Sequence, residues 1–187
     1  IEFFQKQGGI LRFSAILKAG FHPDSLAALE KIKQIEKIGW GIYQMAGYEP
    51  RSYPDLVTAC IQAPKAVVCL LSALAFHEVT NEIPNSVNLA IAYGSHTNKI
   101  NYPPVKFYRF KFDTWIAGVE EHKIEGHFIR VYSLAKTVAD CFKFRNRIGM
   151  DTARQALKAA IKDKRISPKE IMYYAKICRV ANIIKPI

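Results

Sequence analysis

The chain has 187 residues, of which 50% are hydrophobic, and it carries a formal net charge of +11 at pH 7. This composition excludes a chain that is disordered throughout, because it can supply one large hydrophobic core or two small ones. The longest apolar run, residues 66–76, is too short to cross a bilayer, so we expect a soluble, cytoplasmic protein with no membrane partner.

Three short helices are predicted at the start of the chain, over residues 1–7, about 12–19, and 22–31. Gly8 and Gly9 close the first helix, because glycine accepts the left-handed geometry of a helix C-terminus. Pro23 and Asp24 suit the first turn of the third helix. The turn before this helix contains glycine, which is typical of a helix-turn-helix.

The third helix and the segment behind it have the pattern of a winged helix. Leu26, Leu29 and Ile32 mark the buried stripe of the helix. Residues 35–45 hold two β-prone stretches around a Gly-x-Gly turn, which predicts a hairpin with a tight tip. We therefore predict a winged helix-turn-helix DNA-binding domain over residues 1–48. A small helical subdomain with no nucleic-acid role is the alternative.

A polar, proline-bearing stretch, residues 47–54, is predicted as the linker to a second domain over residues 49–187. Its helices are expected at 55–62, 65–77, 134–147 capped by Ser133, 152–162 capped by Asp151, and from a capping box at Ser167–Glu170 through Cys178. Its strands are expected at 87–93, 105–112 and 119–131, the last being a hairpin that turns near Glu125-Gly126. This order predicts an α+β fold that ends in a helical bundle.

The sequence offers no specific pattern for catalysis, a metal or a cofactor. The four cysteines are widely spaced without a C-x-x-C pair, so we expect reduced core residues. His77 ends an apolar helix and is expected to be a capping or core residue. Tyr93-Gly94-Ser95 offers the turn of a nucleotidyltransferase, but no pair of carboxylates one residue apart follows it. We therefore predict no catalytic residue, no metal ligand and no cofactor.

One enzyme remains as an alternative, a metal-dependent nuclease built on Asp113, Glu121 and Lys123. An acid followed by an acid-x-Lys pair on a neighbouring strand can hold a metal ion and position a water. The same letters occur at the solvent-facing edge of many hairpins, which is the competing interpretation.

The positive charge is concentrated in the last third of the chain. Residues 1–48 hold six Lys and Arg against four Asp and Glu, whereas residues 130–187 hold fourteen against four. The candidate basic face consists of Lys143, Arg145, Arg147, Arg154, Lys158 and Lys162. The last three repeat every four residues, which places them along one face of a helix. Such a face can meet nucleic-acid phosphate or an acidic protein, or can serve only to solvate the helix.

Several stretches in a fixed order carry a family resemblance over nearly the whole chain. They are Gly-Gly-Ile-Leu-Arg at 8–12, Ile-Gly-Trp-Gly-Ile-Tyr at 38–43, Ala-Val-Val-Cys-Leu-Leu-Ser-Ala-Leu-Ala-Phe-His at 66–77, Ile-Pro at 83–84, Tyr-Pro-Pro at 102–104, Gly-Val-Glu-Glu-His at 118–122 and Val-Tyr-Ser-Leu-Ala-Lys-Thr-Val-Ala-Asp-Cys-Phe-Lys at 131–143. With these stretches the chain resembles AbiEi, the antitoxin family of the type IV, or AbiE-type, abortive infection toxin-antitoxin systems.

The resemblance implies two functions. The N-terminal winged helix is expected to bind inverted repeats in double-stranded operator DNA upstream of its own operon and to repress it. The C-terminal domain is expected to counter a nucleotidyltransferase-like toxin, without necessarily forming a stable complex with it. The resemblance thus implies a transcriptional autorepressor and antitoxin that is not an enzyme.

The chain departs from the family pattern where DNA would be read. Pro23 and Asp24 stand where arginines are expected to open the recognition helix, and Trp40 stands at the wing tip in place of an arginine. Base edges are commonly read by arginine forks, so we expect weak or unusual sequence readout. The remaining candidates are His22, Ser25 and Lys31 for base edges, and Lys33, Lys37 and Trp40 for backbone or groove contacts.

Overall fold

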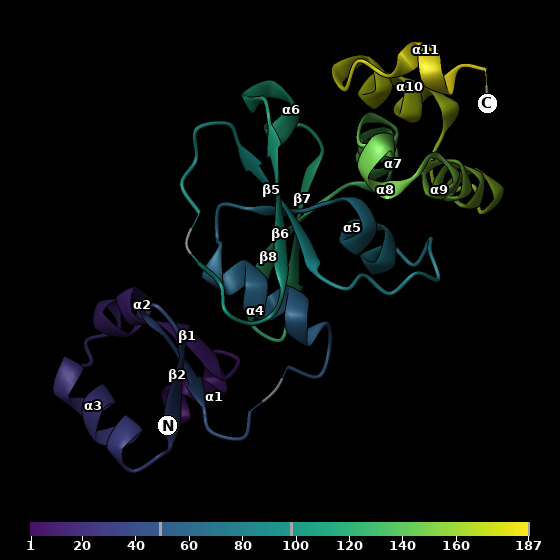
Figure 1. Ribbon diagram of the computed structural model, residues 1–187. Helices are drawn as coiled ribbons and strands as arrows, with labels where there is room; N and C mark the ends of the chain where they lie inside the picture. The colour runs from purple at the N-terminus through teal and green to yellow at the C-terminus, as the bar shows by residue number, and fades with distance from the viewer. Residues whose placement is uncertain (49, 98, 187) are drawn as a thin grey trace. The chain divides into compact units, whose positions relative to one another are not determined.

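Three helices and a three-stranded sheet form the N-terminal part of the computed structural model, which describes residues 1–48, 50–97 and 99–186 (Figure 1). The elements are α1 (Glu2–Lys6), β1 (Ile10–Arg12), α2 (Phe13–Lys18), α3 (Pro23–Lys31), β2 (Ile35–Gly39) and β3 (Ile42–Met45). The three predicted helices and the predicted hairpin are confirmed. Strand β1 is an addition that the sequence pattern does not predict.

Two glycines end α1 and turn the chain into β1. The Gly9 N–H donates to the Phe4 carbonyl at 2.7 Å, and the Gly8 N–H donates to the Gln5 carbonyl at 3.4 Å. Both glycines have positive φ, as this type of helix C-terminus requires. The chain that leaves them pairs antiparallel with β3, and β3 pairs with β2, giving the order β1-β3-β2.

The first 45 residues have a hydrophobic core of their own. Phe4, Leu11, Ile16, Leu26 and Ile35 are buried together, one from each of five elements. The predicted buried stripe of α3 is wrong at Ile32. The helix ends at Lys31, and the Ile32 side chain is 62% exposed.

The chain divides into two compact units. Unit 1 comprises residues 1–64, 97–104 and 122–129, and unit 2 comprises residues 65–96, 105–121 and 130–187. Helix α4 (Pro54–Gln62) therefore belongs to unit 1. The domain boundary after residue 48 stays a prediction.

The predicted linker is tied down within unit 1. The backbone N–H groups of Arg51 and Ser52 donate to the Glu125 carboxylate at 2.9 and 2.8 Å, and the Tyr48 hydroxyl donates to it at 3.1 Å. Although burial acts in the opposite direction, these hydrogen bonds lower the pKa of Glu125. Glu49, in the same stretch, lies outside the described residues.

Unit 2 contains most of a five-stranded mixed sheet in the order β6-β5-β4-β8-β7. The strands are β4 (Val67–Val68), β5 (Val87–Ala92), β6 (Val105–Phe110), β7 (Val119–Ile124) and β8 (His127–Tyr132). Strand β4 runs antiparallel to β5 and parallel to β8, and β5 runs parallel to β6. The predicted turn between β7 and β8 is confirmed at Glu125 and Gly126, which both have positive φ.

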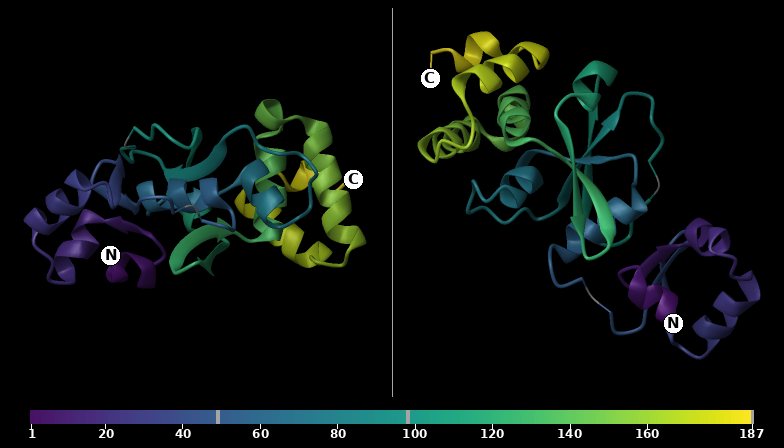
Figure 2. Two further views of the ribbon diagram at one scale, coloured as in Figure 1. Left: turned by 90° about the horizontal axis from the view of Figure 1, so that it is seen from below. Right: turned by 180° about the vertical axis from the view of Figure 1, so that it is seen from behind.

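The remaining helices belong to unit 2, and the last ones gather at the C-terminal end of the chain (Figures 1 and 2). They are α5 (Leu70–Phe76), α6 (Phe112–Ile116), α7 (Leu134–Lys143), α8 (Arg145–Ile148), α9 (Met150–Lys162), α10 (Pro168–Ile177) and α11 (Ala181–Ile184). Helix α7 contacts α5, α9 and α10. The predicted mixed α+β fold is confirmed. In the described part of the chain, no helix combines the length and apolar character needed to span a membrane.

The helix predicted over residues 65–77 is wrong in its first half. Val67 and Val68 form the short central strand β4, buried between β5 and β8. Cys69 stays extended, and the helix starts only at Leu70. A short apolar run fits a buried strand as well as a buried helix, so only its sheet neighbours decide between them.

Three predicted boundaries are corrected. The strand from residue 105 ends at Phe110, and Phe112 opens α6. The helix capped by Ser133 ends at Lys143, and a separate short helix, α8, follows it. Asp151 lies in the first turn of α9 and does not cap it, because Gly149 holds the N-cap position. The predicted capping box of α10 is confirmed.

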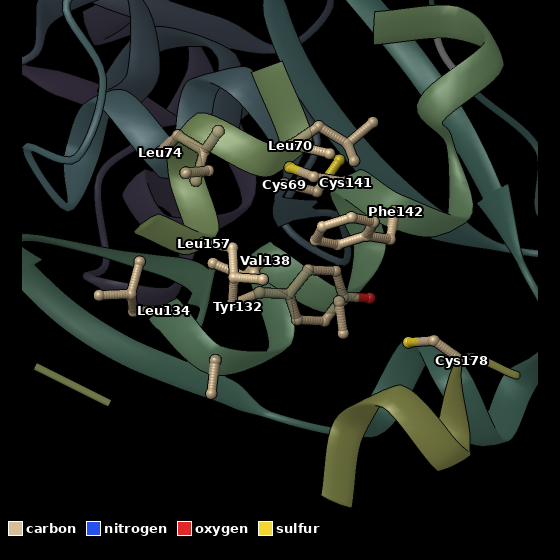
Figure 3. Packing of buried hydrophobic residues seen from close by; sticks show 14 of the residues in the cluster. Cys69, Leu70, Leu74, Tyr132, Leu134, Val138, Cys141, Phe142, Leu157 and Cys178 are labelled. Carbon is tan, nitrogen blue, oxygen red and sulfur yellow. The ribbon is translucent and has the colours of Figure 1, made fainter. Parts of the chain in front are cut away.

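The core of unit 2 lies between the sheet and the helices, and Figure 3 shows part of it around Tyr132 and Phe142. All four cysteines are buried and free, as predicted. His77 occupies the C-cap position of α5, which confirms the predicted capping position, and its Nε2 lies 2.7 Å from the Tyr132 carbonyl oxygen on β8.

One ion pair is buried in this core. The Lys136 ammonium contacts the Asp140 carboxylate at 2.5 Å, and both side chains are fully buried. The Cys178 thiol donates to the same carboxylate at 3.2 Å. The ammonium also lies 4.0 Å from the centre of the Tyr132 ring and 5.0 Å from that of Phe110. The lysine charge is thus satisfied by one carboxylate and two aromatic faces.

This pair makes a pH dependence testable. Burial raises the pKa of Asp140, and the Lys136 ammonium opposes that rise. In a Lys136→Met variant the opposing charge is gone, so the folded-state pKa lies further above the ordinary value of 3.8. The folded state then binds more protons than the unfolded state, and stability falls as pH rises from about 4 through the folded-state pKa. Urea unfolding across a pH series measures this fall, and a Lys136→Met, Asp140→Leu double variant should lack it.

Candidate nucleic-acid interface

Helix α3 presents an open face within unit 1. The His22 Nδ1 accepts a hydrogen bond from the Asp24 N–H at 3.3 Å, which caps the helix N-terminus. Leu26 turns into the core, whereas Ser25 and Lys31 are exposed. The candidates on this helix are therefore accessible, although one ring nitrogen of His22 is engaged in the cap.

The charge of α3 differs from that expected of a DNA-reading helix. Asp24 and Glu30 are exposed carboxylates on α3. Its last residue, Lys31, is the one lysine or arginine in the helix. On the helix itself, Coulombic attraction to phosphate can come only from Lys31, and further attraction must come from residues beyond the helix. Lys33, just after it, is exposed and has a φ of 55°.

The hairpin β2–β3 carries an exposed tryptophan at its tip. Gly41 has a φ of 64° and closes the turn, and Trp40 beside it is 91% exposed. Lys37 is exposed on β2, where the pairing register with β3 shifts between Lys37 and Gly39. The structure thus places one exposed cation, Lys37, and one exposed tryptophan, Trp40, on this hairpin.

A groove opens beside the hairpin. Its volume is about 500 Å³, and it is lined by Arg12, Phe13, Ser14, Lys37, Trp40, Gly41, Tyr43 and Gln62, all in unit 1. The Arg12 guanidinium donates through Nε to the Ile61 carbonyl at 2.9 Å, and partial burial lowers its pKa. The sequence interpretation assigns Arg12 no role, although it lies in one of the stretches that resemble AbiEi. Its position beside Lys37 in the groove depends on β1, which the sequence pattern does not predict.

The predicted basic face divides between two places in unit 2. Arg154, Lys158 and Lys162 are exposed along α9, opposite its buried alanines, so their shared helix face is confirmed. Arg154 lies 3.9 Å from the Asp151 carboxylate. The other predicted members, Lys143, Arg145 and Arg147, stand at the end of α7 and on α8. Arg145 donates to the carbonyl of Phe142 at 2.9 Å.

The residues of the nuclease alternative lie on different kinds of element. Asp113 is exposed in the first turn of α6, whereas Glu121 and Lys123 are exposed on β7. The Lys123 ammonium lies 5.7 Å from the centre of the Phe128 ring. In the described ranges, no group of three or more His, Cys, Asp or Glu side chains is placed to hold a metal ion. The nuclease alternative stays a prediction.

Comparison with models of known protein families finds no match, and comparison with curated proteins finds none either. The assignment to the AbiEi family therefore stays a prediction. The interface described above is supported by its geometry alone.

Proposed function

We propose that residues 1–48, within unit 1, form a winged helix-turn-helix that binds double-stranded DNA, and that the chain is the transcriptional autorepressor and antitoxin of a type IV toxin-antitoxin system. The supporting observation is the exposed face of α3 next in the chain to a hairpin with an exposed Lys37 and Trp40. In a winged helix such a helix enters the major groove, while the hairpin contacts the backbone or the minor groove.

The proposed contacts rely more on phosphates than on base edges. Lys31, Lys33 and Lys37 are exposed cations on or after α3, and the helix itself offers no arginine. Phosphate contacts position a protein on DNA but carry no sequence information. Sequence readout then depends on Ser25 and His22, so specificity over random DNA is expected to be modest.

The antitoxin role rests on the resemblance and is assigned to the C-terminal domain, residues 49–187. The proposed target is a nucleotidyltransferase-like toxin, and the proposal requires no catalysis by this chain. Co-expression of such a toxin from the neighbouring reading frame is the test. Growth arrest should be relieved by the chain and also by a Lys31→Ala, Lys37→Ala variant, because DNA binding and toxin neutralisation are assigned to different predicted domains. Loss of relief in that variant would contradict the division of roles.

Replacing Lys31 or Lys37 by alanine is expected to flatten the salt dependence of DNA binding. Each lost phosphate contact reduces the slope of log K against log salt by about 0.9. Fluorescence anisotropy with labelled promoter DNA at several salt concentrations measures that slope. Lys6→Ala, on the exposed side of α1, removes the same charge outside the proposed interface and should leave the slope unchanged.

Two results would overturn the proposal. Unchanged slopes in both the Lys31 and Lys37 variants would place the DNA contacts elsewhere. Equal affinity for the promoter and for scrambled DNA of the same length would remove the repressor function, even if unit 1 binds DNA.

A further inference from the structure

Three cations in unit 2 gather over a cluster of aromatic rings, and one of them comes from a strand far away in sequence. Lys106 on β6 lies with its ammonium 5.7 Å from the centre of the Tyr108 ring, and the Arg147 guanidinium lies 5.9 Å from the same ring. Lys143 lies 5.6 Å from the centre of the Phe110 ring. We call Lys106, Lys143 and Arg147 the cation cluster.

The rings beneath these cations are fixed by packing. Tyr108 and Phe110 are 2% and 1% exposed, and the Phe144 ring lies 5.4 and 5.1 Å from them. Arg147 also lies 5.8 Å from the Phe144 ring. Cation–π attraction to immobile rings restricts where the charged groups can lie. Less conformational entropy is then lost when an anion binds to them.

The cation cluster has little counter-charge, because the carboxylate that interacts electrostatically with Lys143 is that of the buried Asp140, and it is already paired with Lys136. Among the described residues, none of its three members forms an ion pair with a carboxylate. Two other cations of unit 2 have such a partner, since Arg154 lies near Asp151 and Lys136 contacts Asp140. Like charges held close together raise the local potential, so this part of the surface attracts an external anion.

We propose that the cation cluster binds the phosphate backbone of a nucleic acid without reading its sequence. Tyr108 and Phe110 are two residues apart on one strand, so their Cα atoms are spaced by about 6.6 Å along it. Lys106 and Arg147 lie over the first of these residues and Lys143 over the second, so an extended polyanion such as a polynucleotide backbone can meet more than one of them. Lys106 and Arg147 are exposed, so their side chains are open to such a chain, and Lys143 is half-buried beside them. This site goes beyond the proposed function, because it does not require unit 1 to bind DNA.

The test uses the full chain with Lys31, Lys33 and Lys37 replaced by alanine, so that binding by unit 1 is weakened. A labelled single-stranded oligonucleotide of mixed sequence is titrated by anisotropy at several salt concentrations. Replacing Lys106, Lys143 and Arg147 by glutamine should weaken binding at least tenfold and reduce the salt slope by about 2, at about 0.7 per phosphate. A variant with Lys106→Arg and Lys143→Arg keeps the charges and should keep binding.

The matched control removes the same charge from α9 by replacing Arg154, Lys158 and Lys162 with glutamine. It should leave the salt slope near that of the parent chain.

An equal loss in both triple variants would show that only net charge matters and would overturn the proposal. Absence of oligonucleotide binding by the parent chain would also overturn it. Inorganic triphosphate that competes as well as the oligonucleotide would identify a free polyphosphate as the ligand and reject the nucleic acid. Promoter binding by the unaltered unit 1 tests the proposed function separately.

Discussion

Replacing Asp140 by alanine is expected to lower the free energy of unfolding by about 3–5 kcal/mol. The variant leaves the Lys136 ammonium fully buried, without the carboxylate that it contacts at 2.5 Å. It also removes the acceptor of the Cys178 thiol hydrogen bond. An unpaired buried charge costs far more than a lost surface pair, because it cannot recover its hydration. Urea unfolding followed by circular dichroism measures the loss.

The double variant Lys136→Met, Asp140→Leu separates charge from packing. It leaves no charge in the core, and its apolar side chains occupy similar volumes, so most of the lost stability should return. The interaction energy from the double-mutant cycle should then be large. A double variant as unstable as Asp140→Ala would show that packing, and not the unpaired ammonium, causes the loss.

Local signals predict the structure best. Gly8 and Gly9, the capping box of Ser167 and Glu170, and the turn at Glu125 are each confirmed. Each depends on hydrogen bonds or backbone conformations within a few residues, and the sequence of those residues determines them.

The predictions fail where the local structure depends on contacts with residues far away in the sequence. Val67 and Val68 form a strand only because β5 and β8 flank them. Arg12 donates a hydrogen bond to the carbonyl of Ile61, which lies 49 residues later in the sequence.

The predicted basic face also shows that sequence spacing can group cations only within one element. Helical spacing predicts the row of Arg154, Lys158 and Lys162 on α9, because that row lies within one element. It cannot predict that Lys106 joins Arg147 over the Tyr108 ring, since β6 and α8 are about forty residues apart in sequence. The charge count locates the basic third of the chain, and the fold decides which cations act together.

Replacing Gly9 by alanine is expected to destabilise unit 1 by about 3 kcal/mol and to abolish DNA binding with it. Gly9 has a φ of 72°, where an L-residue costs about 1–2 kcal/mol. A Cβ at this position would also overlap the Tyr48 ring, and overpacking adds about 1–3 kcal/mol. The Gly9 carbonyl accepts from the Met45 N–H at 2.8 Å, so a shift to relieve the overlap would disturb the joined strands β1 and β3.

Gly20 provides the matched control, because its φ is 87° and an added Cβ would meet nothing within 4 Å. Gly20→Ala should therefore cost only the backbone strain, about 1–2 kcal/mol, and should retain promoter binding at low temperature. Thermal unfolding measures the loss of stability in each variant, and anisotropy with labelled promoter DNA measures whether each variant still binds DNA. Equal losses would show that the Tyr48 ring yields to the added methyl group, and that the contact between this ring and Gly9 does not hold the fold of the proposed DNA-binding unit.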